Sequence, residues 1–62
     1  MKKPRCKLSG QDGNIFNLVG IAKDKLKDVG LEEQAEEMTK RIMSSHSYDE
    51  ALTIIMDYVE TY

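Results

Sequence analysis

Along most of the chain, apolar residues recur every three or four positions, the spacing that puts side chains on one face of an α-helix. In the first such stretch they are Ile15, Leu18, Val19, Ala22, Leu26 and Val29. The preceding segment, Ser9 to Asn14, is dense in turn formers, and either Asp12 or Asn14 is suited to cap a helix N-terminus. The pattern predicts an amphipathic helix over residues 14–29.

Two glycines of this first helix have different expected roles. Gly30 stands where a left-handed C-cap residue falls, and Leu31 can reach back to Leu26 as in a Schellman ending. Gly20 lies in the helix interior, where glycine costs about 1 kcal/mol relative to alanine. We therefore interpret Gly20 as a place where another helix or a strand approaches closely.

Two further apolar stripes predict two more helices, over residues 31–44 and 48–60. The earlier stripe has glutamates near its start and Lys40 and Arg41 near its end, as the helix dipole favours. Its apolar members are Leu31, Ala35, Met38 and Ile42. Ser47 and Glu50 form an S-x-x-E capping box that opens the last helix. The apolar face of that helix comprises Tyr48, Ala51, Leu52, Ile55, Val59 and Tyr62.

The N-terminal segment has the alternation of a strand rather than of a helix. Cys6, Lys7 and Leu8 read apolar, polar, apolar, and Pro4 suits the first position or an edge. Residues 6–9 are predicted as a short strand that pairs either with the C-terminal segment 59–62 or with a second chain. Segment 59–62 equally suits the end of the last helix, and the N-terminal segment then stays an unpaired arm. The fold class is mainly α: a compact three-helix domain with a short N-terminal strand.

The length of 62 residues allows one domain, residues 1–62, with one small core. A core of this size seldom supplies more than about 3 to 5 kcal/mol, and small proteins often add a disulfide, a metal or a partner subunit. A single cysteine, Cys6, excludes an internal disulfide, and one histidine, His46, leaves a Cys/His zinc site short of ligands. Self-association, most simply as a homodimer, is the remaining way to add stability.

Charge is distributed unevenly along the sequence. Residues 1–5 form a basic arm, and Lys2, Lys3, Arg5 and Lys7 are the residues expected to contact a partner or a nucleic acid. The net charge is −2, so the rest of the chain is acidic. A basic arm can touch phosphates, but an acidic body repels a polyanion. Nucleic acid is therefore the less favoured partner.

No residue pattern indicates catalysis, a cofactor or a metal. His46 lies in a serine-rich link where the second helix must end, and we interpret it as a helix-end residue because histidine tolerates positive φ. Asp12-Gly13-Asn14 lacks the rest of a calcium loop, and Gly10 and Gly13 match no phosphate-binding motif. No apolar run is long enough to span a membrane, and no signal peptide begins the chain, so a cytoplasmic location is expected.

Several short strings give the chain a family resemblance. They are Lys7 to Asn14 (KLSGQDGN) with Phe16 and Gly20, then Tyr48-Asp49, then Met56 to Glu60 (MDYVE). In these strings the chain resembles a family of small uncharacterised bacterial proteins found in phages and other mobile elements. The resemblance implies a genomic setting and carries over no catalytic residue.

The sequence supports a first hypothesis of a small, non-catalytic protein-interaction module of prophage or mobile-element origin. It would bind another protein or itself, with the N-terminal strand and the last helix forming much of the interface, and no small-molecule substrate or cofactor. The alternative hypothesis is a nucleic-acid accessory protein whose basic arm grips phosphates while the acidic body contacts another protein.

Overall fold

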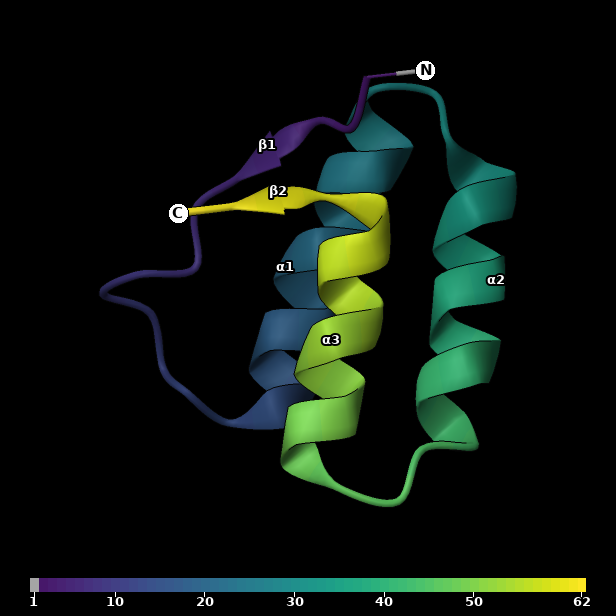
Figure 1. Ribbon diagram of the computed structural model, residues 1–62. Coiled ribbons are helices and arrows are strands. Elements are labelled where there is room, and N and C mark those ends of the chain that lie inside the picture. Colours follow the sequence, from purple (N-terminus) through teal and green to yellow (C-terminus); the bar gives the residue numbers. More distant parts are fainter. Residues whose placement is uncertain (1) are drawn as a thin grey trace.

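The computed structural model describes residues 2–62 and contains an up-down-up bundle of helices with a small sheet beside its upper end (Figure 1). The predicted mainly α fold is confirmed. In chain order the elements are β1 (Arg5–Cys6), α1 (Ile15–Asp28), α2 (Glu32–Met43), α3 (Tyr48–Tyr58) and β2 (Glu60–Thr61).

The N-terminal strand pairs within the chain. β1 and β2 are parallel, with Arg5 opposite Glu60 and Cys6 opposite Thr61. The predicted pairing with the C-terminal segment is thus confirmed, but the predicted bounds 6–9 are wrong. Beyond Cys6 the ladder ends because the backbone N–H groups of Leu8 and Ser9 both donate to the carbonyl oxygen of Tyr62, at 2.7 and 2.9 Å. Gly10, at φ 75°, then turns the chain away from the sheet.

The last helix is shorter than predicted, ending at Tyr58 rather than at residue 60. Val59 is extended, with φ −134° and ψ 151°. The next backbone groups bond to the N-terminal segment instead: the N–H of Glu60 donates to Pro4 at 2.8 Å, and that of Tyr62 to Cys6 at 3.1 Å. Strand pairing therefore replaces the final helical turn.

The ends of α1 follow local sequence signals closely. Asn14 is the N-cap, and its side-chain oxygen accepts from the N–H of Phe16 at 2.9 Å. At the other end Gly30 has φ 82°. Its N–H donates to Lys27 at 3.0 Å, and that of Leu31 donates to Leu26 at 2.8 Å. These two bonds are the Schellman pair, which confirms the predicted ending.

The link between α2 and α3 follows its signals only in part. The hydroxyl of Ser47 accepts from the N–H of Glu50 at 3.1 Å, as in a capping box. The carboxylate of Glu50 accepts from the N–H of His46 at 3.4 Å. α2 ends at Ser44, its C-cap residue, whose φ of −94° and ψ of 0° lie in the right-handed region. Among the described residues only glycines have positive φ, so the predicted role of His46 is wrong.

The core lies between the three helices and is closed by the sheet at one end. Leu26, Met38, Ile55 and Val59 are the largest fully buried side chains. Ile54 and Tyr58 are also buried, although the predicted stripe omits them, while Tyr48 and Tyr62 are about half exposed. The predicted close approach at Gly20 is wrong, because a Cβ there would have no neighbour within 4 Å.

Candidate interaction surface

An apolar groove lies at the end of the bundle where α1 and α3 begin and α2 ends, the lower end in Figure 1. We call it the lower groove. Its volume is about 440 Å³. It is lined by Ile15, Phe16, Ile42, Met43, Ser45, Ser47, Tyr48 and Ala51. Three helix ends therefore contribute to one largely apolar depression.

Two large apolar side chains in the lower groove are almost fully exposed. Phe16 is 84% exposed and Met43 is 81% exposed, and Tyr48 beside them is 46% exposed. Single exposed apolar residues are ordinary on protein surfaces, but clustered ones mark binding sites. Phe16 and Met43 lie outside the apolar stripes of their helices. Large apolar residues outside the buried stripe were therefore a sequence signal for an exposed apolar surface, and the prediction did not use it.

The walls of the lower groove are fixed by hydrogen bonds between its parts. The hydroxyl of Tyr48 donates to the carbonyl of Gly13 at 2.6 Å, which ties the start of α3 to the turn before α1. The carboxylate of Asp12 accepts from the N–H of Asn14, and Asn17 donates its side-chain amide to the carbonyl of Asp12. The Asp12-Gly13-Asn14 turn thus acts in helix capping.

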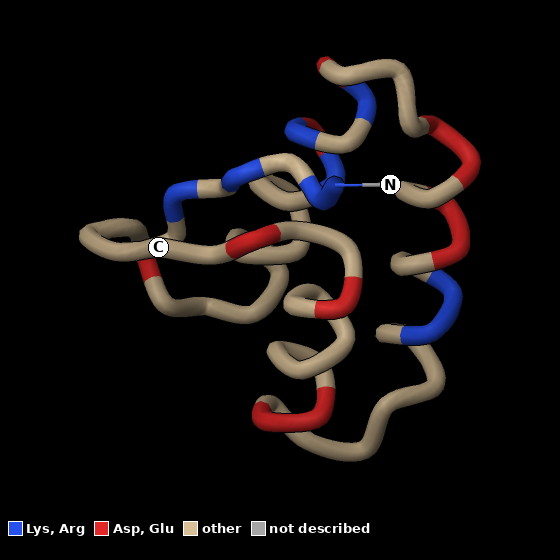
Figure 2. The backbone as a smooth tube through the Cα atoms, turned by 45° about the horizontal axis from the view of Figure 1, so that its top comes forward, with Lys and Arg blue, Asp and Glu red and all other residues tan. Residues whose placement is uncertain are grey.

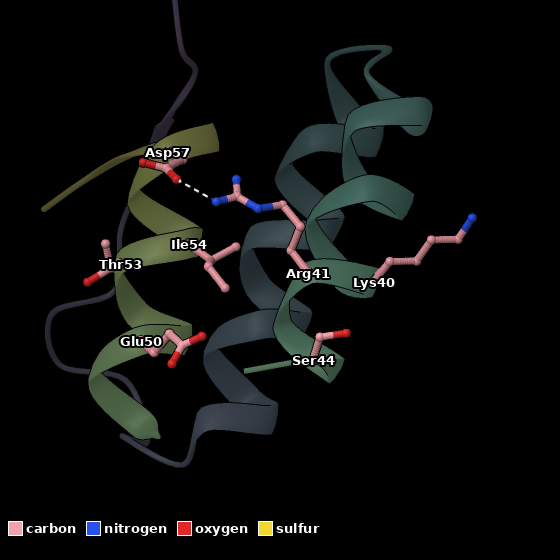
Figure 3. Close-up of a pocket in the computed structure, with 7 residues that line it drawn as sticks. All are labelled: Lys40, Arg41, Ser44, Glu50, Thr53, Ile54 and Asp57. Atoms are coloured by element: carbon pink, nitrogen blue, oxygen red, sulfur yellow. Dashed lines mark hydrogen bonds and ion pairs between the residues drawn. The ribbon is translucent and has the colours of Figure 1, made fainter. Parts of the chain in front are cut away.

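A second groove, of about 600 Å³, runs between α2 and α3 and is lined mainly by residues with polar or charged side chains (Figure 3). Arg41 forms an ion pair with Asp57 at 3.1 Å across it and donates to the hydroxyl of Tyr58 at 3.3 Å. That hydroxyl in turn donates to the carboxylate of Glu37. Lys40 extends away from α3 (Figure 3). Arg41 and Asp57 are therefore engaged with each other across the groove.

The chemistry of this network is that of a structural tie. Burial raises the pKa of Tyr58, and the hydrogen bond from Arg41 only partly opposes this. Hydrogen bonds to Tyr58 and Asp57 raise the pKa of Arg41. At neutral pH the phenol therefore keeps its proton and the guanidinium its charge, so Tyr58 serves as a hydrogen-bond donor and not as a nucleophile.

The predicted contact residues Lys2, Lys3, Arg5 and Lys7 lie at the other end of the bundle, where they line two hollows together with residues from the second half of α1 and from the turn that follows it. Two of them are held by the protein itself. The ammonium of Lys3 donates to the carbonyl of Met56 at 2.8 Å, and the guanidinium of Arg5 lies 4.4 Å from the ring centre of Tyr62. Lys2 and Lys7 are exposed.

A hollow of about 380 Å³ separates the start of the sheet from α1. Arg5 and Lys7 line it from β1 and the residue that follows, and Asp24, Lys25 and Asp28 line it from α1. The lining of this hollow therefore contains three cations, Arg5, Lys7 and Lys25, and two carboxylates, Asp24 and Asp28. The two carboxylates of α1 reduce the positive potential of this face.

Cys6 and His46 do not come together. Cys6 belongs to β1, beside the upper end of the bundle, whereas His46 belongs to the α2–α3 link at the lower end (Figure 1). Burial raises the pKa of Cys6, and the positive charge of Lys25 opposes the rise. Cys6 is therefore held as a neutral thiol inside the core.

Within residues 2–62, no group of three His, Cys, Asp or Glu residues is arranged to hold a metal ion. In the same part of the chain, every helix is too short or too polar to cross a bilayer. Comparisons with protein-family models, curated proteins and solved structures gave no match to this chain.

Proposed function

We propose that this chain is a small non-catalytic protein-interaction module and that the lower groove is its binding surface. The observation that carries the proposal is the joint exposure of Phe16 and Met43 beside that groove. Removing a large apolar side chain from water contributes about 1.5 to 3 kcal/mol. Covering these two side chains would therefore supply a substantial part of the free energy of binding.

The polar groups of the lower groove support binding rather than catalysis. The hydroxyl of Ser45 donates to the carbonyl of Ile42, that of Ser47 accepts from Glu50, and that of Tyr48 donates to Gly13. Each of the three hydroxyls thus has a backbone partner. Nucleophilic catalysis needs a hydroxyl or thiol hydrogen-bonded to a base, whereas the partners of these three hydroxyls are backbone groups.

The test is capture of tagged protein from crosslinked host cells, with nuclease treatment and mass spectrometry. We expect a specific protein that persists after nuclease treatment, is lost with Phe16→Ser and is kept with Met56→Ser. Met56 is a matched control, since it is about half exposed and does not line the lower groove. Equal recovery with both variants, or recovery of the bait alone, would refute the lower groove as a site for another protein.

A prophage or mobile-element setting is the second part of the proposal, and it rests on the resemblance carried by residues 7–14. That string forms the loop between β1 and α1. Its Leu8 and Ser9 bond to Tyr62, and its Gly13 bonds to Tyr48. We expect expression of the protein to rise when such an element is induced and not otherwise.

The nucleic-acid alternative is favoured by one observation, the gathering of cations at one end of the fold. Residues 2–7 and the second half of α1 carry seven of the nine lysines and arginines (Figure 2). Because Pro4 and Arg5 hold the sheet together, Lys2→Gln with Lys7→Gln is a cleaner test than removing residues 1–5. If this alternative is correct, the unmodified protein binds a labelled oligonucleotide at low salt, and the double variant binds it more weakly. Absence of binding by the unmodified protein would reject it.

A further inference from the structure

The segments that build most of the lower groove contain no positive charge. Residues 8–22, which include the first half of α1, have no lysine or arginine, and residues 42–62, which include all of α3, have none either. The same two segments contain five carboxylates: Asp12, Asp49, Asp57, Glu50 and Glu60. Asp57 lies near the far end of α3 and Glu60 lies in β2, so these segments contribute three carboxylates and no lysine or arginine to the groove end of the bundle.

Three of these carboxylates lie next to groove residues. Asp49 and Glu50 follow Tyr48 in the first turn of α3. Asp12 precedes Gly13, whose carbonyl accepts the hydrogen bond from Tyr48. The α2 cations are directed elsewhere, since Arg41 pairs with Asp57 and Lys40 extends away from α3 (Figure 3). Asp12, Asp49 and Glu50 thus lie within three positions of groove residues along the chain, and we call these three carboxylates the acidic rim.

We propose that the lower groove binds an amphipathic helical segment of another protein, with an apolar stripe flanked by lysine and arginine. This inference rests on the proposed function and names the chemistry of the partner. Helices bind in apolar grooves through side chains spaced three and four residues apart. Met43 supplies a flexible wall that can adapt to such side chains, while Phe16 supplies a rigid one.

A second copy of this chain fits the groove less well, for two reasons. In a two-fold dimer the same patch meets itself, so the acidic rims around Asp12, Asp49 and Glu50 would face each other and repel. The basic arm of a second copy is also engaged within its own fold. Lys3 bonds to Met56, Arg5 stacks on Tyr62, and β1 pairs with β2.

The test uses three synthetic peptides of about 16 residues, long enough to populate a helix. They share one stripe of leucine and phenylalanine, and their remaining positions are lysine in the first, glutamate in the second and glutamine in the third. Binding to the full chain is followed by amide chemical shifts at moderate salt and neutral pH. We expect the lysine peptide to bind at least about tenfold more tightly than the glutamate peptide. Its shifts should be centred on Phe16, Met43 and Tyr48.

Matched variants separate the apolar and the electrostatic contributions. Met43→Ser should weaken the lysine peptide about tenfold, whereas Met56→Ser should not. Asp49→Lys should weaken the lysine peptide and strengthen the glutamate peptide. Glu33→Lys is its control, because Glu33 occupies the first turn of α2 as Asp49 does that of α3, but does not adjoin the groove. Far-UV circular dichroism establishes that each variant is folded.

The outcomes distinguish this inference from the proposed function. If the three peptides bind the groove equally, or if the glutamate peptide binds best, the inference is wrong while the interaction surface stands. If instead the groove signals shift with protein concentration and no peptide competes, the occupant is a second copy and the inference is again wrong. If neither peptides nor concentration affect the groove signals, both the inference and the proposed function fail.

Discussion

Gly20 and Gly30 make a matched pair of positions for testing the backbone account of this fold. At both, an added Cβ would have no neighbour within 4 Å. They differ in conformation, since Gly30 has φ 82° whereas Gly20 lies within α1 without a positive φ. The same added methyl group therefore meets opposite backbone preferences at the two positions.

Gly20→Ala should stabilise the protein and Gly30→Ala should destabilise it. In a helix interior alanine is better than glycine by roughly 0.5 to 1 kcal/mol. In the left-handed region an alanine costs roughly 1 to 2 kcal/mol, offset in part by its smaller freedom in the unfolded chain. The two variants should thus differ by about 2 kcal/mol, or about 10 °C in Tm for a domain of this size.

Thermal and urea unfolding, followed by far-UV circular dichroism, measure this difference. A Gly20→Ala variant less stable than the parent would show that a neighbouring element does approach this position, as the sequence pattern had suggested. A neutral Gly30→Ala variant would show that the Schellman ending of α1 contributes little. Either result would refute the reasoning.

Three further predictions concern the core and its titrating groups. Met38→Ala should lower the free energy of unfolding by about 2 to 5 kcal/mol, because Met38 is fully buried. Circular dichroism should then show much of the chain unfolded, and little change would contradict the described core. Burial raises the pKa of both Tyr58 and Cys6, so each binds its proton more tightly in the folded chain. Stability in urea should therefore be constant near neutral pH and fall above about pH 9, and a rise there would contradict the assignment. Labelling of Cys6 by a thiol reagent should be slow in the native protein and fast in denaturant, whereas fast native labelling would show that β1 opens readily.

Features set by neighbouring residues were predictable from the sequence. The Asn14 cap, the Ser47 cap and the left-handed Gly30 each depend on residues within one helical turn. The end of α3 was not predictable in this way. No glycine or proline follows Tyr58, and the helix stops because Glu60 and Tyr62 bond to Pro4 and Cys6, far away along the chain.

The candidate surface was less predictable than the fold. Helical periodicity shows which face of each helix is buried, but not which helix ends remain uncovered after the helices pack. Phe16 and Met43 become a joint feature only because α1 and α2 run in opposite directions and bring a start and an end together. The basic N-terminal residues were identified by charge alone, and charge does not indicate that Lys3 donates to Met56 or that Arg5 lies over the ring of Tyr62.

Site-specific photocrosslinking in host cells would test the central claim, that the lower groove is a protein-binding surface, most directly. A benzophenone amino acid would replace Phe16 in the groove and, as the control, Val29, which is also exposed but lies at the other end of α1. We expect a discrete, nuclease-resistant protein adduct from position 16 and none from position 29. No adduct from position 16, or the same adducts from both positions, would contradict the claim.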